Sequence, residues 1–240
     1  MAFQTVFKRY ELKYMLTLEQ KEKILEAMSP YMQLDKYGRT TIRNIYFDTD
    51  SYRLIRRSIE KPAYKEKLRL RGYGVIKPED EVFLEMKKKY KGIVYKRRVS
   101  MEEQQATAYM ADPAARLDAG QIGREIDYFK DFYGTLQPAL YLSYDRQAWH
   151  SADNSLRVTL DWNICYRRDN LTLVSEPVGE QLLEPGQSLL EIKTATAMPL
   201  WLASLLSEYK IRQTSFSKYG TAHMRLLKEE KTESRGFSYA

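Results

Sequence analysis

The segment 64–99 holds three neighbouring stretches in which charged and apolar side chains alternate, and no other feature constrains the fold as strongly. In an extended strand, successive side chains point to opposite faces. The first stretch therefore puts Leu68 and Leu70 on one face of a strand. Its four basic side chains share the other face: Lys65, Lys67, Arg69 and Arg71. Such a strand buries one face and presents a positively charged one.

The two following stretches continue this alternation. Glu85 and Lys87 share one face of the second stretch, and Lys96 and Arg98 share one face of the third. Glycines separate the stretches, as the turns of an antiparallel meander require. A charged face in water is the common interpretation of such alternation. Like charges on neighbouring strands destabilise a sheet, however, so the positive excess favours a face that binds a multiply charged anion.

Composition narrows the class of protein. The net charge of +7 suits a polyanionic partner such as nucleic acid, a membrane surface or phosphate chains. The single cysteine, Cys165, excludes an intramolecular disulfide, and two histidines are too few for a histidine-rich metal centre. Carboxylates would have to hold any metal ion, which favours Mg²⁺ or Mn²⁺. Neither a membrane span nor a signal peptide is evident, so a cytoplasmic protein is expected.

Periodicity elsewhere predicts further strands and helices in a single domain over residues 1–240, with a charged tail from about residue 228. Strands are expected over 7–14, 41–47, 139–149, 156–161 and 188–193. Helices are expected over 18–29, 101–115, 121–132 and 198–209, with a last one through 227. The fold class is therefore α+β, an eight-stranded antiparallel β-barrel with flanking helices. Because the helices cover the apolar faces, the basic faces are expected to line the interior and bind phosphate chains.

Eight short motifs along nearly the whole chain resemble the VTC-type polyphosphate polymerase domain. This domain belongs to the triphosphate tunnel metalloenzymes, which are related to the CYTH phosphohydrolases and adenylate cyclases. The motifs are Arg9-Tyr10-Glu11-Leu12-Lys13-Tyr14, Tyr46-Phe47-Asp48-Thr49, Lys67-Leu68-Arg69-Leu70-Arg71, Glu85-Met86-Lys87, Asp145-Arg146, Leu156-Arg157-Val158, Leu190-Glu191-Ile192-Lys193 and Ser217-Lys218-Tyr219. Each motif alone is weak, and their shared order makes the resemblance specific.

The resemblance implies a tunnel that binds a nucleotide triphosphate and, with Mn²⁺ or Mg²⁺, transfers the terminal phosphoryl group of ATP to a growing polyphosphate chain. By position, the family's phosphate-binding residues would be Lys13, Arg69, Arg71, Lys87, Lys96, Arg146, Arg157 and Lys218. Ser217 accompanies Lys218, and Lys67 and Lys193 are further substrate-binding candidates. Glu191 matches the metal-binding glutamate, with Glu85 or Glu11 as a helper. Arg9 stands where the CYTH signature has a glutamate, which agrees with the VTC-type branch.

Within this interpretation the four arginines are expected to clamp the triphosphate, because guanidinium groups bind phosphate oxygens in a bidentate manner. Lys87 and Lys96 would offset the charge that develops during transfer. Other roles stay open: Glu11 and Glu85 could form ion pairs, and Ser217 could cap the last helix. The expected partners are ATP and polyphosphate or triphosphate, with no specific nucleic acid. Hydrolysis of triphosphates and non-catalytic polyphosphate binding are the alternative functions.

Overall fold

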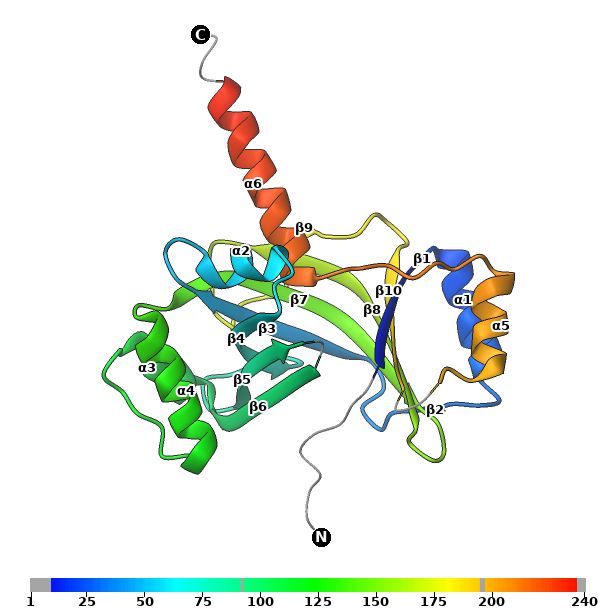
Figure 1. Cartoon of the computed structure of the whole chain (residues 1–240), viewed down its shortest axis with the longest axis horizontal. Coiled ribbons are helices and arrows are strands. Elements are labelled where there is room, and N and C mark those ends of the chain that lie inside the picture. The colour runs from blue at the N-terminus through cyan, green and yellow to red at the C-terminus, as the bar shows by residue number, and fades with distance from the viewer. Residues whose placement is uncertain (1–9, 92, 195–196, 237–240) are drawn as a thin grey trace. The chain divides into compact units, whose positions relative to one another are not determined.

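The computed structural model describes residues 10–91, 93–194 and 197–236, and over these ranges the chain has the expected α+β fold (Figure 1). An antiparallel sheet of ten strands is flanked by six helices within this part of the chain. Eight strands follow the order β1-β10-β8-β7-β3-β4-β5-β6, and two short strands join it, β2 beside β7 and β9 beside β8. The eight longer strands confirm the expected number. Among the described residues this order has two ends, β1 and β6, rather than closing into a ring.

The bounds of most elements agree with the sequence periodicity, but β8 continues six residues beyond the expected end at 161, and α3 ends four residues before the expected end at 115. The strands are β1 (Tyr10–Leu16), β2 (Gln33–Leu34), β3 (Thr40–Asp48), β4 (Tyr64–Tyr73), β5 (Glu81–Tyr90), β6 (Ile93–Glu102), β7 (Gln137–His150), β8 (Leu156–Arg167), β9 (Glu180–Gln181) and β10 (Ser188–Thr194). The helices are α1 (Leu18–Met28), α2 (Arg53–Ile59), α3 (Glu103–Ala111), α4 (Gly120–Tyr133), α5 (Leu200–Glu208) and α6 (Lys218–Gly236).

Contacts between residues group the chain into two compact units. Unit 1 comprises Met1–Ile42, Ser143–Cys165 and Leu183–Ser215, and unit 2 comprises Arg43–Leu142, Tyr166–Leu182 and Phe216–Ala240. Three strands, β3, β7 and β8, contribute residues to both units. Each unit has its own apolar core.

In unit 1 the apolar faces of β1, β8 and β10 pack with α1 and α5. The register pairs Leu190 with Leu160 and Ile192 with Val158, and all four side chains are buried. Thr17 begins α1 with a capping box, because Thr17 and Gln20 accept hydrogen bonds from each other's backbone N–H groups. The face of these strands opposite the core carries their charged residues.

In unit 2 the apolar faces of β4 and β5 pack with α3 and α4. Leu68 lies opposite Met86 and Leu70 lies opposite Leu84, and these four side chains are buried. The alternation in β4 and β5 therefore separates apolar from basic side chains, as the sequence predicts. Apolar side chains fill the core, and the basic side chains share the other face.

Helix α6 is longer than the sequence suggests, since it continues to Gly236 instead of ending near residue 227. Lysine and glutamate dominate this last part, and both are good helix formers even without an apolar stripe. Glu230 also forms an ion pair with Arg168. None of the helices within the described ranges is long and apolar enough to span a membrane.

Candidate phosphate-binding site

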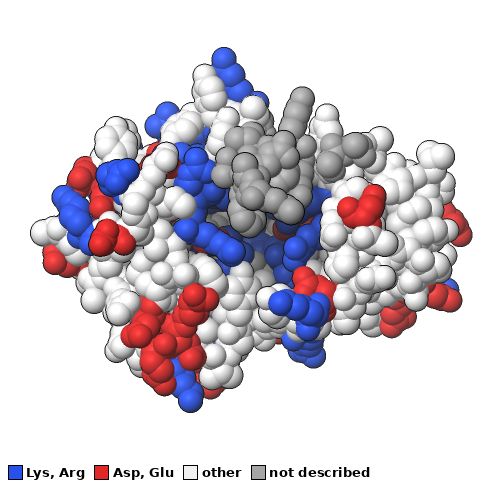
Figure 2. Space-filling view, turned by 90° about the horizontal axis from the view of Figure 1, so that it is seen from below, with Lys and Arg blue, Asp and Glu red and all other residues white. Residues whose placement is uncertain are grey.

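Basic side chains of β4, β5 and β6 form rows across the strands of unit 2. The register places Lys67 opposite Lys87 and Lys87 opposite Lys96, and we call these three residues the lysine row. Two positions along the strands, about 7 Å away, the next row contains Arg69, Glu85 and Arg98. Lys and Arg side chains gather on the face that Figure 2 shows.

The lysine row is unfavourable as a cross-strand arrangement, since like charges directly opposite each other destabilise a sheet. The neighbouring row contains a glutamate, whereas the lysine row contains three ammonium groups. A bound polyanion would remove this repulsion. The row is therefore suited to an anion with several charges, and less to a single small one.

We expect Lys87→Gln to have opposite effects in the absence and presence of a polyanion. Without anion the melting temperature should stay constant or rise, because the repulsion with Lys67 and Lys96 is relieved. With saturating tripolyphosphate, the stabilisation of the wild type should shrink in the variant, because weaker binding gives a smaller stabilisation. Thermal unfolding with and without tripolyphosphate measures both effects.

Lys88→Gln is the matched control, because Lys88 lies on the opposite face of β5, where the register places it opposite Glu66. Its substitution removes the same charge and should leave the response to tripolyphosphate unchanged. Equal responses of the two variants would contradict a role for the lysine row.

Arg69 and Arg71 are held in place by Glu85. Arg69 donates to Glu85 through Nε at 2.8 Å and Nη2 at 2.5 Å, and Arg71 Nη1 lies 3.8 Å from the same carboxylate. Asn44 accepts from Arg71 Nε at 3.0 Å. Burial acts to raise the pKa of Glu85, but Arg69 and then Arg71 lower it. Glu85 thus forms the ion pairs that the sequence left open, and its metal role stays a prediction.

Tyr46 on β3 belongs to this network, although the sequence analysis assigned it no role. Its phenol oxygen accepts a hydrogen bond from Arg69 Nη1 at 3.2 Å. Its ring stacks on Tyr219, with centroids 4.4 Å apart. Burial acts to raise the pKa of Tyr46, but Arg69, Lys67 and Arg71 together lower it to about 8. The phenol beside the predicted phosphate ligands therefore ionises at a lower pH than an ordinary tyrosine.

This pKa predicts a pH-dependent affinity for tripolyphosphate. As the pH rises through about 8, a negatively charged Tyr46 competes with the anion for Arg69, so affinity should fall several-fold between about pH 7 and about pH 9. In Tyr46→Phe the decline should be clearly shallower, because no charge develops there. Equilibrium binding across this range, at constant ionic strength, measures the difference. Parallel profiles for the two proteins would exclude this role of Tyr46.

Helix α6 begins beside the lysine row. Ser217 caps it, since the Ser217 hydroxyl accepts from Gly220 N at 3.2 Å, as one of the two sequence interpretations expects. Lys67 Nζ also donates to this hydroxyl at 3.3 Å, and Lys218 is the first residue of the helix. Both predicted residues at the start of α6 therefore belong to unit 2, with the lysine row.

In unit 1 Glu191 lies among three cations, and we call these four residues the Glu191 cluster. Ion-pair distances from its carboxylate are 3.5 Å to Lys13 Nζ, 3.6 Å to Arg146 Nη2 and 3.5 Å to Lys193 Nζ. The cross-strand register pairs Glu191 with Lys13. Only 8% of the Glu191 side chain is exposed. The structure thus brings three predicted cations together around the predicted carboxylate of Glu191.

Arg146 is fixed by Asp161, a partner that sequence reasoning missed. Arg146 donates to both carboxylate oxygens of Asp161, through Nε at 2.5 Å and Nη2 at 2.6 Å. Burial alone would lower the pKa of Arg146, but the stronger combined effect of Tyr144, Asp161 and Glu191 raises it well above its usual value. The signal in the sequence is the alternation of β8, which puts Asp161 on the same face as Arg157 and Thr159.

The remaining predicted residues of unit 1 are less enclosed. Arg157 lies opposite Lys193 in the register and is half exposed, with its guanidinium 3.3 Å from Asp35. On the other side of β10, Glu11 of β1 lies opposite Lys193 in the register. The Glu11 carboxylate is 3.6 Å from Lys13 Nζ. Arg157 and Glu11 therefore extend the charged face beyond the Glu191 cluster. Arg9 lies outside the described residues.

A sequence model of the VTC domain matches residues 8–227. The chain belongs to the VTC domain family. Its structure also resembles that of a protein from Bacillus halodurans described as a putative adenylate cyclase, with a TM-score of 0.56, 15% identity, and coverage of 89% of this chain and 96% of the other. A putative adenylate cyclase from Vibrio parahaemolyticus matches with a TM-score of 0.49 and 11% identity, over 92% and 99% of the two chains.

Membership of the VTC domain family and this likeness confirm the fold of the triphosphate tunnel class, and the family implies dependence on a divalent metal. Within the described ranges, no group of three histidine, cysteine or acidic side chains is placed to hold a metal ion by itself. Mg²⁺ and Mn²⁺ sites commonly combine one or two carboxylates with substrate phosphates. Glu191 fits such a site, because its ion pairs in unit 1 are longer than those of Asp161.

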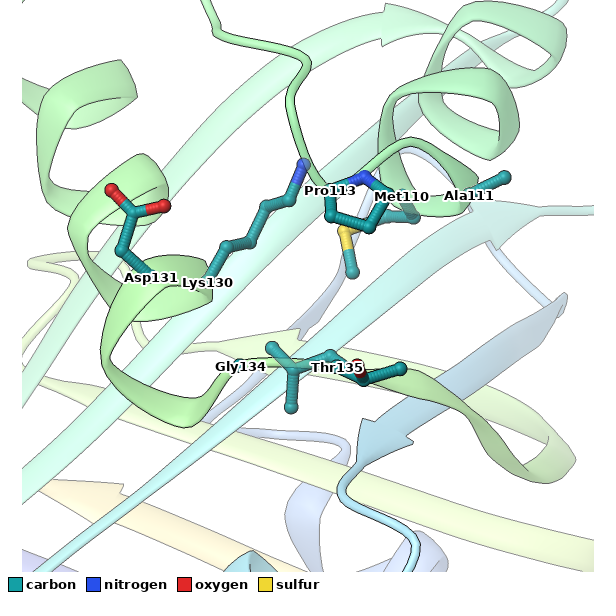
Figure 3. A pocket seen from close by; sticks show the side chains of 8 residues that line it. Met110, Ala111, Pro113, Lys130, Asp131, Gly134 and Thr135 are labelled. Carbon is teal, nitrogen blue, oxygen red and sulfur yellow. The ribbon is translucent and has the colours of Figure 1, made fainter.

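A hollow of about 250 Å³ beside α3 and α4 of this VTC domain contains one lysine, but its ammonium group has a structural role (Figure 3). Lys130 Nζ donates to three backbone carbonyls, Tyr109 and Asp112 at 2.9 Å and Ala115 at 3.4 Å. An ammonium group has three protons to donate. Lys130 therefore fastens the end of α3 and is not available to bind a phosphate.

Proposed function

We propose that the protein is a metal-dependent polyphosphate polymerase that uses ATP. The observation that carries this proposal is the lysine row, three lysines directly opposite one another on adjacent strands. A chain of phosphates is the anion whose repeated charge matches such a row. Membership of the VTC domain family supports this choice of ligand.

In the proposed reaction, the terminal oxygen of a polyphosphate chain attacks the γ-phosphorus of ATP. The bond between the γ-phosphorus and the β–γ bridging oxygen breaks, ADP leaves, and the chain is longer by one phosphate. The protein contributes position and positive charge, which are the main needs of phosphoryl transfer. A bound divalent cation would neutralise further charge on the phosphate oxygens, with Glu191 as its ligand from the protein.

The roles of the basic residues follow from their surroundings. Arg69, Arg71 and Arg146 are pre-oriented by carboxylates, so their guanidinium groups can bind phosphate oxygens with little loss of side-chain freedom. Lys87 and Lys96 would supply positive charge beside the phosphate oxygens on which negative charge develops during transfer. The other candidates would bind further phosphates of the substrate: Lys13, Lys67, Lys193, Arg157, Ser217 and Lys218.

Incubation of the purified protein with ATP and Mn²⁺, followed by gel electrophoresis with a polyphosphate stain, tests the proposal. Chains that lengthen with time, together with an equivalent amount of ADP, are the expected result. Orthophosphate without chains would instead indicate a phosphohydrolase. Binding of tripolyphosphate without turnover of any nucleotide would indicate a non-catalytic polyphosphate-binding module. Chelation of divalent cations should abolish turnover in either enzyme.

A further inference from the structure

The basic face of β4 and β5 continues beyond the lysine row to a corner formed by four more lysines. Lys65 lies directly opposite Lys89, one row beyond Lys67 and Lys87. Lys91 N donates to Ala63 O at 2.9 Å, which ties the turn after β5 to the residues just before β4. We call Lys61, Lys65, Lys89 and Lys91 the lysine corner.

Two of these lysines have an unfavourable backbone conformation. Lys61 has φ of 55° and Lys91 has φ of 46°, in the left-handed region that glycine or asparagine adopts more readily. Non-glycine residues in this region are strained, and such residues cluster at functional sites. The lysine side chains are therefore present at two positions where the backbone alone would favour glycine.

The partners of the lysine corner among the described residues are neutral: Lys65 Nζ donates to the backbone carbonyl of Ser58 at 3.1 Å, and Lys91 Nζ lies 5.4 Å from the centre of the Tyr90 ring. Among the described residues, no carboxylate lies within ion-pair distance of these four ammonium groups. Glu66, the acidic residue on β4, lies on the opposite face, where Tyr64 and Tyr133 donate to it at 2.6 Å. The pKa of Lys65 is lowered, first by burial and then by Lys89 and Lys61, so these cations act on one another.

We infer that the lysine corner is a second polyanion subsite, which binds the part of a polyphosphate chain that extends beyond the phosphates at the lysine row. This inference rests on the proposed function for the identity of the ligand. Lys65 and Lys89 share one face of β4 and β5 with Lys67 and Lys87, in adjacent rows about 7 Å apart, and Lys61 and Lys91 lie in the segments just outside these strand ends. A linear chain can therefore contact the lysine row and the lysine corner in succession. Lysines suit this role, since a flexible point charge does not require a fixed phosphate geometry.

The double variant Lys61→Gly/Lys91→Gly tests the inference. Both side chains are exposed and both backbones favour glycine, so the variant should fold with an unchanged or higher melting temperature. Lys77→Ala/Lys228→Ala is the control, because it removes the same charge from two exposed lysines elsewhere in unit 2. Equilibrium binding is measured for tripolyphosphate and for a linear polyphosphate many times longer, in the absence of ATP.

The glycine variant should bind the long chain about 5- to 10-fold more weakly than the wild type, and tripolyphosphate equally well within about 2-fold, since only the long chain reaches both groups. The control should bind both ligands like the wild type. Equal losses for the two ligands, an equal loss in the control, or no loss would overturn the inference. A selective loss for double-stranded DNA but not for long polyphosphate would also overturn it. Failure of the wild type to bind tripolyphosphate would refute the proposed function instead.

Discussion

Replacement of Glu191 by glutamine is expected to lower polyphosphate synthesis by roughly 100-fold or more, the usual range for loss of a key electrostatic group. The amide keeps the shape of the side chain but loses the charge that would hold a divalent cation. Binding of tripolyphosphate without metal should be retained or strengthened, because one negative charge leaves a cluster of Lys13, Arg146 and Lys193. Turnover at several Mn²⁺ concentrations and metal-free binding measure the two effects.

Glu26→Gln is the matched control for this experiment. Glu26 is an exposed residue of α1 in the same unit, and its substitution makes the same change in charge. It should leave both turnover and binding unchanged. A Glu191→Gln protein that keeps its turnover, or that loses anion binding together with turnover, would contradict the assignment of Glu191 as a metal ligand.

Asp48→Ala is expected to lower the free energy of unfolding by about 3 to 5 kcal/mol, because it leaves several buried donors without an acceptor. Asp48 is fully buried and accepts from the backbone N–H groups of Thr49, Leu54 and Ile55 at 2.8–2.9 Å. It also accepts from the hydroxyl of Tyr219 at 3.1 Å. The carboxylate thus joins β3, α2 and α6. Urea unfolding monitored by circular dichroism measures the loss.

Tyr219→Phe separates one of these contacts from the others. It removes the hydroxyl donor to Asp48 and keeps the ring that stacks on Tyr46, so the loss should be about 1 kcal/mol. Burial, and then Asp48, raise the pKa of Tyr219, so its hydroxyl stays a donor at neutral pH. A loss in Tyr219→Phe as large as that in Asp48→Ala would mean that the backbone contacts of Asp48 contribute little.

Local alternation was sufficient to predict the strands and their basic faces. Leu68 and Leu70 are buried while Lys67 and Arg69 lie on the other face, because the side-chain period of a strand is fixed by its geometry. The capping box of α1 was predictable for a similar reason, since Thr17 and Gln20 are three residues apart. These features depend on residues that are close in sequence.

The partners of the site residues could not be predicted in this way. Tyr46 and Tyr219 are 173 positions apart in the printed sequence, and Asp161 reaches Arg146 from the next strand. Each contact depends on strand order and register over long distances, which hydrophobic periodicity does not encode. The sequence also contains many carboxylates, and periodicity cannot decide which of them meets an arginine and which could meet a metal ion.

The direct pairing of β4 with β5 limits how such a chain can change its length. One inserted residue within β5 would exchange the two faces of the rest of that strand, and bring charged side chains such as Lys87 into the core while Met86 left it. Insertion at the exposed turn around Val75 and Lys77 leaves both registers intact. Variation in length among related chains is therefore expected to concentrate at this turn, and strands that carry the phosphate ligands should differ by substitution alone.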